Sequence, residues 1–165
     1  MIYLLISLFL DLLLGNILNT TYQHLNYFFP LIFITSLTLS YILIKNYKIF
    51  FLTIILIGLV YDTLYSDIFL LNTYYFILSS LFLYIFYKNK SPSILNIILI
   101  STSIFLMYDI YIFFTIILLD YSVFKIDYLL YKLIRTFPLN FIYLIISVLI
   151  LKSRIFGSKK KSLKF

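Results

Sequence analysis

The fold is decided by a stretch in the middle of the chain, which reads Ile68-Phe-Leu-Leu-Asn-Thr-Tyr-Tyr-Phe-Ile-Leu-Ser-Ser-Leu-Phe-Leu-Tyr-Ile-Phe-Tyr87. These 20 residues carry no formal charge. A helix rises about 1.5 Å per residue, so roughly 20 apolar residues are needed to cross the hydrocarbon core of a bilayer, which is about 30 Å thick. The stretch therefore predicts a transmembrane helix.

The composition extends this interpretation to all 165 residues. Hydrophobic residues make up 64% of the chain and charged residues 12%, against roughly 45–50% and 25% in soluble domains. A soluble globule of this size could not bury 18 Phe and 17 Tyr together with the aliphatic residues. The composition disfavours a soluble enzyme, a nucleic-acid-binding domain and a disordered tail. The absence of Cys excludes disulfides and thiolate metal sites.

Six apolar stretches follow one another along the sequence. Their runs are continuous rather than alternating, which favours helices over a β-barrel. The predicted fold is an all-α polytopic membrane bundle of residues 1–151 with about six transmembrane helices, followed by a basic tail at 152–165. Asp11 in the first stretch and the lack of a basic start argue against a cleaved signal peptide. The spans are expected near 2–19, 28–45, 49–66, 68–87, 93–119 and 136–151.

Basic residues in short loops predict the orientation. On the six-span interpretation only Lys125, Lys132 and Arg135 lie outside the cytoplasm, where Asp120 and Asp127 offset them. We therefore expect both termini in the cytoplasm, with the tail touching anionic membrane lipid. The ten basic residues on the cytoplasmic side are Lys45, Lys48, Lys88, Lys90, Lys152, Arg154, Lys159, Lys160, Lys161 and Lys164.

Three carboxylates fall inside predicted spans, namely Asp11, Asp62 and Asp109. Each costs roughly 2.5–3.5 kcal/mol to insert, so each needs a reason to be there. One interpretation is an ion or substrate path; the other is that each carboxyl is buried between helices and holds them together. The second is favoured, because no basic residue is expected within a span to complete a relay.

The third and fourth spans are predicted to form a tight antiparallel pair. Asp62 and Asn72 each lie about one turn from the short connection between them, so the two side chains should lie at similar depth and close together. Gly58, one turn before Asp62, would allow a close crossing of helices. Asn140 and Asn16 lie at related depths, which predicts a polar cluster in the outer half of the bundle.

Residues 121–135 are amphipathic at helical spacing, with Lys125, Tyr128, Lys132 and Arg135 on the polar face. Such a segment can form a helix that lies in the membrane interface. It is expected either to connect the fifth and sixth spans or to offer a docking surface to an extracytoplasmic partner.

The third span and the turn after it resemble the signature region of the rod shape-determining protein MreD family. That pattern has a Gly, three residues, an Asp, a short turn and a Leu-Gly-Leu-Asn-like stretch. The sequence here is Gly58-Leu-Val-Tyr-Asp62-Thr-Leu-Tyr-Ser-Asp-Ile-Phe-Leu70-Leu71-Asn72, with Leu70 where the family usually has Gly. Arg135-Thr-Phe-Pro138-Leu-Asn140 also resembles the entry to the family's last span.

This resemblance implies a non-catalytic scaffold, without a cofactor, in the bacterial inner membrane. Members of the family act in cell shape and lateral peptidoglycan synthesis, together with MreC, MreB filaments, RodA and an elongation-specific penicillin-binding transpeptidase. The family's fold also resembles the substrate-binding subunit of energy-coupling-factor vitamin transporters. A small-molecule uptake component is therefore the alternative. A third class, an ion channel or exchanger, rests only on Asp11 and Asp109.

Overall fold

The structure is a computed structural model that describes residues 2–20, 30–44, 46–65, 68–88, 92–119 and 126–156. In these ranges the chain forms α-helices and no strand, which confirms the predicted all-α class. The helices are α1 (Ile2–Thr20), α2 (Ile32–Leu43), α3 (Tyr47–Tyr65), α4 (Leu71–Tyr87), α5 (Ile94–Leu118) and α6 (Ile126–Phe156).

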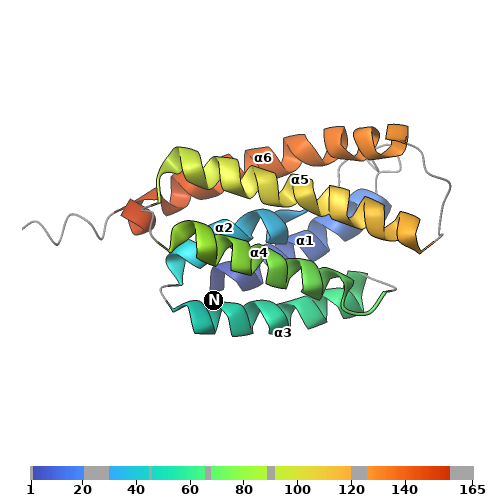
Figure 1. Cartoon of the computed structure of the whole chain (residues 1–165). Helices are drawn as coiled ribbons and strands as arrows, with labels where there is room; N and C mark the ends of the chain where they lie inside the picture. Colours follow the sequence, from blue (N-terminus) through green and yellow to red (C-terminus); the bar gives the residue numbers. More distant parts are fainter. Residues whose placement is uncertain are drawn as a thin grey trace, which may run out of the picture.

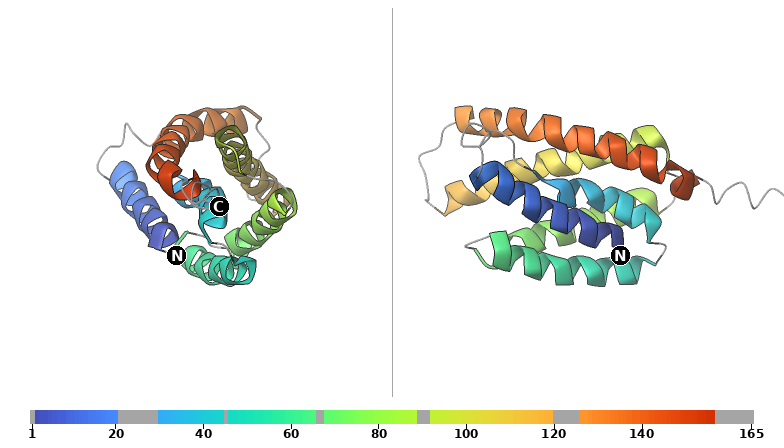
Figure 2. Two further views of the ribbon diagram at one scale, coloured as in Figure 1. Left: turned by 90° about the vertical axis from the view of Figure 1, so that its left-hand side faces the viewer. Right: turned by 180° about the vertical axis from the view of Figure 1, so that it is seen from behind.

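The helices run along a common direction, and α2 lies at the centre of the bundle (Figure 1). Seen end-on, the other helices surround it (Figure 2, left), and α2 contacts every one of them. Aromatic rings pack against its first turn, with the ring centroids of Phe33 and Phe76 5.0 Å apart and those of Tyr61 and Phe76 5.3 Å apart. The core is thus built around one short, fully surrounded helix.

The outer surface of the bundle is more apolar than its centre. Large side chains such as Leu52 and Ile85 are 60% and 74% exposed, whereas Thr35 and Ser36 of α2 are fully buried. Three helices carry stretches long and apolar enough to cross a membrane, and α1, α2 and α4 are shorter apolar helices. This distribution indicates a membrane protein, because lipid tolerates an apolar exterior and small polar residues let helices approach closely. The three longer stretches are Tyr47–Leu64, Ile94–Thr115 and Leu129–Lys152.

The second helix is shorter than the predicted span 28–45. It begins at Ile32, two residues after Pro30, and ends at Leu43, where the Ile44 N–H donates to the Ser40 carbonyl at 2.9 Å. Twelve residues correspond to about 18 Å, which is less than the thickness of a bilayer core. The N-terminus of α2 therefore lies inside the bundle and needs hydrogen-bond acceptors there.

The prediction of a separate helix at 121–135, ahead of a last span at 136–151, is wrong for the residues described. Residues 126–156 form one helix that runs through Pro138. A proline removes one backbone donor, but prolines are tolerated within transmembrane helices. On either side of Pro138, the Thr136 hydroxyl donates to the Lys132 carbonyl at 2.9 Å, and the Asn140 amide donates to the Thr136 carbonyl at 2.7 Å.

Candidate functional site

The carboxylate of Asp62 caps the first turn of α4. Its Oδ1 accepts the Asn72 N–H at 2.7 Å, and its Oδ2 accepts the Thr73 N–H at 2.9 Å and the Thr73 hydroxyl at 2.5 Å. The predicted proximity of Asp62 and Asn72 is confirmed, although the donor is the backbone of Asn72 rather than its side chain. The residue before α4, Leu70, offers no side-chain acceptor of its own, so Asp62 supplies from α3 what an N-cap residue supplies locally.

Gly58 places α3 against α4 one turn below this cap. A Cβ at Gly58 would lie 2.9 Å from Oγ1 and 3.0 Å from Cα of Thr73. Only a residue without a side chain allows this approach, so Gly58 sets the distance over which Asp62 reaches the α4 backbone. The expected close helix crossing is confirmed.

The side chain of Asn72 connects this cap to α5. Its Oδ1 accepts a short hydrogen bond from the hydroxyl of Tyr108, which is buried. One turn further along α5, the Tyr111 hydroxyl donates to the Leu71 carbonyl at 3.1 Å. Tyr108 therefore holds the first turn of α4 in place from the opposite side to Asp62.

The carboxylate of Asp11 does for α2 what Asp62 does for α4. Its Oδ1 accepts the Ile32 N–H at 2.8 Å, and its Oδ2 accepts the Phe33 N–H at 3.2 Å and the Tyr61 hydroxyl at 3.3 Å. Asn140 of α6 completes the cap, because its Oδ1 accepts the Leu31 N–H at 2.7 Å. The backbone N–H groups at the buried start of α2 thus find their acceptors on α1 and α6, the first and last helices of the chain.

Asp109 of α5 is fully buried and faces α6, where the ammonium of Lys132 lies 3.5 Å from its Oδ1. Neither of its oxygens accepts a hydrogen bond from a described residue. Lys132 lies within the apolar stretch Leu129–Lys152, so the expectation that no basic residue falls within a span is wrong. The polar face of this amphipathic segment faces the bundle rather than its surroundings, because Lys132 points toward Asp109 while Ile134 is 71% exposed.

Two of the aspartates lie in one polar cluster. Asp62 caps the turn whose Asn72 accepts the Tyr108 hydroxyl, and Asp11 accepts the hydroxyl of Tyr61, which directly precedes Asp62. This cluster overlaps the predicted one at Asp62 and Asn72. Asn140 instead accepts the Leu31 N–H beside the Asp11 cap. Because the oxygens of Asp11 and Asp62 accept backbone N–H groups of α2 and α4, these two carboxylates hold helices together, which favours the structural role over an ion path.

Some predicted site residues are placed elsewhere or are not described. The guanidinium of Arg135 lies over the ring of Tyr131 rather than in the cluster. Lys125 and residues 157–165 of the basic tail lie outside the described residues, as does the side chain of Asn16. Three further residues, Tyr61, Thr73 and Tyr108, donate hydroxyl hydrogen bonds within the cluster. No sequence signal marks them, because nothing distinguishes them from the other tyrosines and threonines of the chain.

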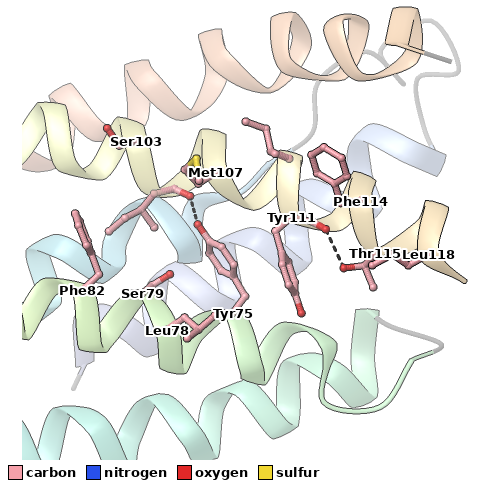
Figure 3. A pocket seen from close by; sticks show the side chains of 12 residues that line it. Tyr75, Leu78, Ser79, Phe82, Ser103, Met107, Tyr111, Phe114, Thr115 and Leu118 are labelled. Carbon is pink, nitrogen blue, oxygen red and sulfur yellow. Dashed lines mark hydrogen bonds between the residues drawn. The ribbon is translucent and has the colours of Figure 1, made fainter. Parts of the chain in front are cut away.

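A groove of about 570 Å³ runs between α4 and α5 on the outside of the bundle (Figure 3). Its α5 wall extends from Ser103 to Leu118, which corresponds to about 22 Å of helix. Most of its hydroxyls donate to backbone carbonyls: Ser103 to Leu99, Thr115 to Tyr111 and Tyr75 to Ile104. The groove therefore presents an apolar surface, and the aspartate cluster does not line it.

No protein-family model, curated protein or solved structure matches this chain. The fold and the site together define a membrane protein, helical in its described ranges, in which two buried carboxylates, those of Asp11 and Asp62, cap neighbouring helices.

Proposed function

We propose that this chain is a non-catalytic scaffold of the bacterial cell-elongation machinery, a multi-pass protein of the inner membrane that binds a single-span, MreC-like partner. On this proposal the chain crosses the membrane about six times and both termini lie in the cytoplasm. MreB, RodA and an elongation-specific transpeptidase are then its further associates in cell shape and lateral peptidoglycan synthesis.

The observation that carries the proposal is the local geometry of the MreD-like signature. Gly58 touches the α4 backbone, Asp62 caps α4 and Asn72 connects it to α5. Leu70, which stands where the family usually has glycine, has φ 66°. Glycine adopts that left-handed conformation at least cost, so the backbone at this position favours glycine, the residue that the family pattern has there. The residues of the signature thus form one set of contacts between α3, α4 and α5, which supports the resemblance.

The groove between α4 and α5 supports lateral binding of a partner helix. Its α5 wall consists of positions such as Ser103, Met107, Ile110 and Phe114, spaced as one helix face. A partner helix in lipid is recognised by packing and a few hydrogen bonds rather than by burial from water. An open, apolar groove several turns long fits such a partner.

The alternative is a substrate-binding subunit of a vitamin-type transporter. A small-molecule site needs several polar groups that converge on the ligand. Asp62 and Asn72 face the interior of the bundle. The Asp62 carboxylate accepts backbone N–H groups of α4, and the Asn72 side chain accepts the Tyr108 hydroxyl. Most hydroxyls at the groove donate to backbone carbonyls. This arrangement favours the scaffold over the transporter.

Affinity purification of the tagged chain from bacterial membranes in a mild detergent tests the proposal. We expect an MreC-like single-span protein and other elongation proteins to co-purify. If these proteins are absent while a vitamin-sized molecule is released on denaturation of the purified chain, the scaffold proposal is wrong and the transporter takes its place.

A further inference from the structure

The end of α2, the start of α3 and the end of α4 lie at the same end of the bundle (Figure 1). Tyrosines and lysines gather there. The rings of Tyr47 and Tyr84 lie against each other, with centroids 4.3 Å apart. Tyr41 of α2 stacks on Tyr87 with centroids 5.9 Å apart. Three helices are thus joined at this end by aromatic contacts rather than by backbone hydrogen bonds.

The hydroxyls of this cluster are unused by the rest of the described chain. The Tyr41 ring also packs edge-on against Phe50 of α3, with ring centroids 5.2 Å apart. None of the hydroxyls of Tyr41, Tyr47 and Tyr84 donates a hydrogen bond to another described residue, whereas Tyr61, Tyr75, Tyr108 and Tyr111 all donate theirs. Three phenol donors therefore lie at this end of the bundle without an acceptor from the described part of the protein.

Two exposed lysines lie at the same end of the bundle as the phenols. Lys88, at the end of α4, lies 6.0 Å from the centre of the Tyr84 ring, and Lys48 follows Tyr47 in the first turn of α3. The described carboxylates belong elsewhere. Asp11 caps the start of α2, at the other end of that helix, and Asp127 lies in the first turn of α6. Asp62 lies toward the opposite end of α3, and Asp109 lies about 22 Å along α5 from its start at this end. The local charge is positive, with no described carboxylate to offset it.

We propose that Tyr41, Tyr47 and Tyr84, together with Lys48 and Lys88, bind the phosphate of an anionic phospholipid headgroup. A phosphodiester accepts hydrogen bonds and carries one negative charge, which matches three phenol donors beside two ammonium groups. Tyrosines are enriched at the level of the headgroups, and basic clusters between transmembrane helices bind anionic lipid. This inference does not depend on the proposed scaffold function.

Native mass spectrometry of the purified protein tests the site, with phosphatidylglycerol and phosphatidylcholine of the same acyl chains as competing probes. We expect one phosphatidylglycerol to be retained in preference to phosphatidylcholine. The variant Tyr41→Phe/Tyr47→Phe/Tyr84→Phe keeps the rings and removes only the hydroxyls, and it should lower this preference by about tenfold or more. Lys48→Gln and Lys88→Gln should each lower it by about fivefold.

A matched control keeps the test specific. Tyr74→Phe removes an exposed tyrosine hydroxyl at the opposite end of α4 and should not change lipid selectivity. Equal retention of the two lipids by the wild type would overturn the proposal. So would an unchanged preference in the triple Phe variant whose thermal unfolding matches that of the wild type. Displacement of the lipid by millimolar inorganic phosphate would assign the site to soluble phosphate instead.

Discussion

Two aspartates solve the same problem at the start of two helices. The first N–H groups of a helix have no partner within it and are usually satisfied by the N-cap side chain. The residues before α2 and α4 are Leu31 and Leu70, and neither can accept a hydrogen bond through its side chain. Asp11 and Asp62 supply the missing acceptors from neighbouring helices. Each carboxylate therefore fixes both the position where a helix begins and the neighbour against which it packs.

The two described glycines provide a matched test of the α3–α4 crossing. Gly58→Ala should lower the free energy of unfolding by roughly 1–3 kcal/mol, because its Cβ would overlap Thr73. Gly15→Ala has no atom within 4 Å of the new Cβ and should be neutral or stabilise α1 by up to about 1 kcal/mol. Thermal or denaturant unfolding in detergent measures both. Equal effects of the two substitutions would contradict the close crossing.

Leu70 is the one described non-glycine residue with a positive φ, at 66°. A left-handed conformation costs an L-residue roughly 1–2 kcal/mol, and the Leu70 side chain is 43% exposed, so little packing would be lost with it. Leu70→Gly should therefore raise the unfolding free energy by about 1 kcal/mol. A decrease in the same unfolding assay would show that the side chain matters more than the backbone conformation.

Contacts between helices could be predicted from the sequence only for residues that lie close to a short connection between two consecutive helices. Asp62 and Asn72 flank a short connection, so antiparallel pairing alone brings them together. The contact of Asp11 with the start of α2 could not be predicted, because its partners are backbone N–H groups that no residue type marks. Lys132 was assigned to a membrane interface because its segment is amphipathic; the buried carboxylate of Asp109, distant in sequence, instead turns that polar face inward.

The Asp109–Lys132 pair should behave as a unit that joins α5 to α6. Lys132→Leu alone leaves a buried carboxylate unpaired and should cost roughly 3–5 kcal/mol of stability. The double variant Asp109→Leu/Lys132→Leu removes both charges and should recover most of that loss. A double-mutant cycle on unfolding free energies measures the coupling. Additive effects of the two single substitutions would show that the pair contributes nothing as a pair.

The arrangement of the whole bundle follows from a polar centre and an apolar exterior. The sequence predicted the helical class and the approximate positions of α1 to α5, because long apolar runs leave few alternatives in lipid. It did not predict that α2 lies in the middle, surrounded by the others. That position depends on the buried hydroxyls of α2 and on caps from Asp11 and Asn140, which are tertiary contacts between distant parts of the chain.

The proposed six-span arrangement makes a direct prediction about topology. Reporter fusions after residue 165 and near residue 90 should both give a cytoplasmic signal, because basic loops remain on that side. A fusion near residue 120 should give a periplasmic signal. A periplasmic signal at residue 165 would mean that the number of spans is odd.

The central claim, that this protein binds a single-span partner laterally through the groove between α4 and α5, is tested most directly by site-specific photo-crosslinking in bacterial cells. A photoreactive amino acid would replace Met107, which lines the groove and is 56% exposed. The control position is Leu52 on the outer face of α3, which is 60% exposed. The account predicts a crosslink to an MreC-like single-span protein from position 107 and none from position 52. Crosslinks of equal yield from both positions, or only from position 52, would contradict it.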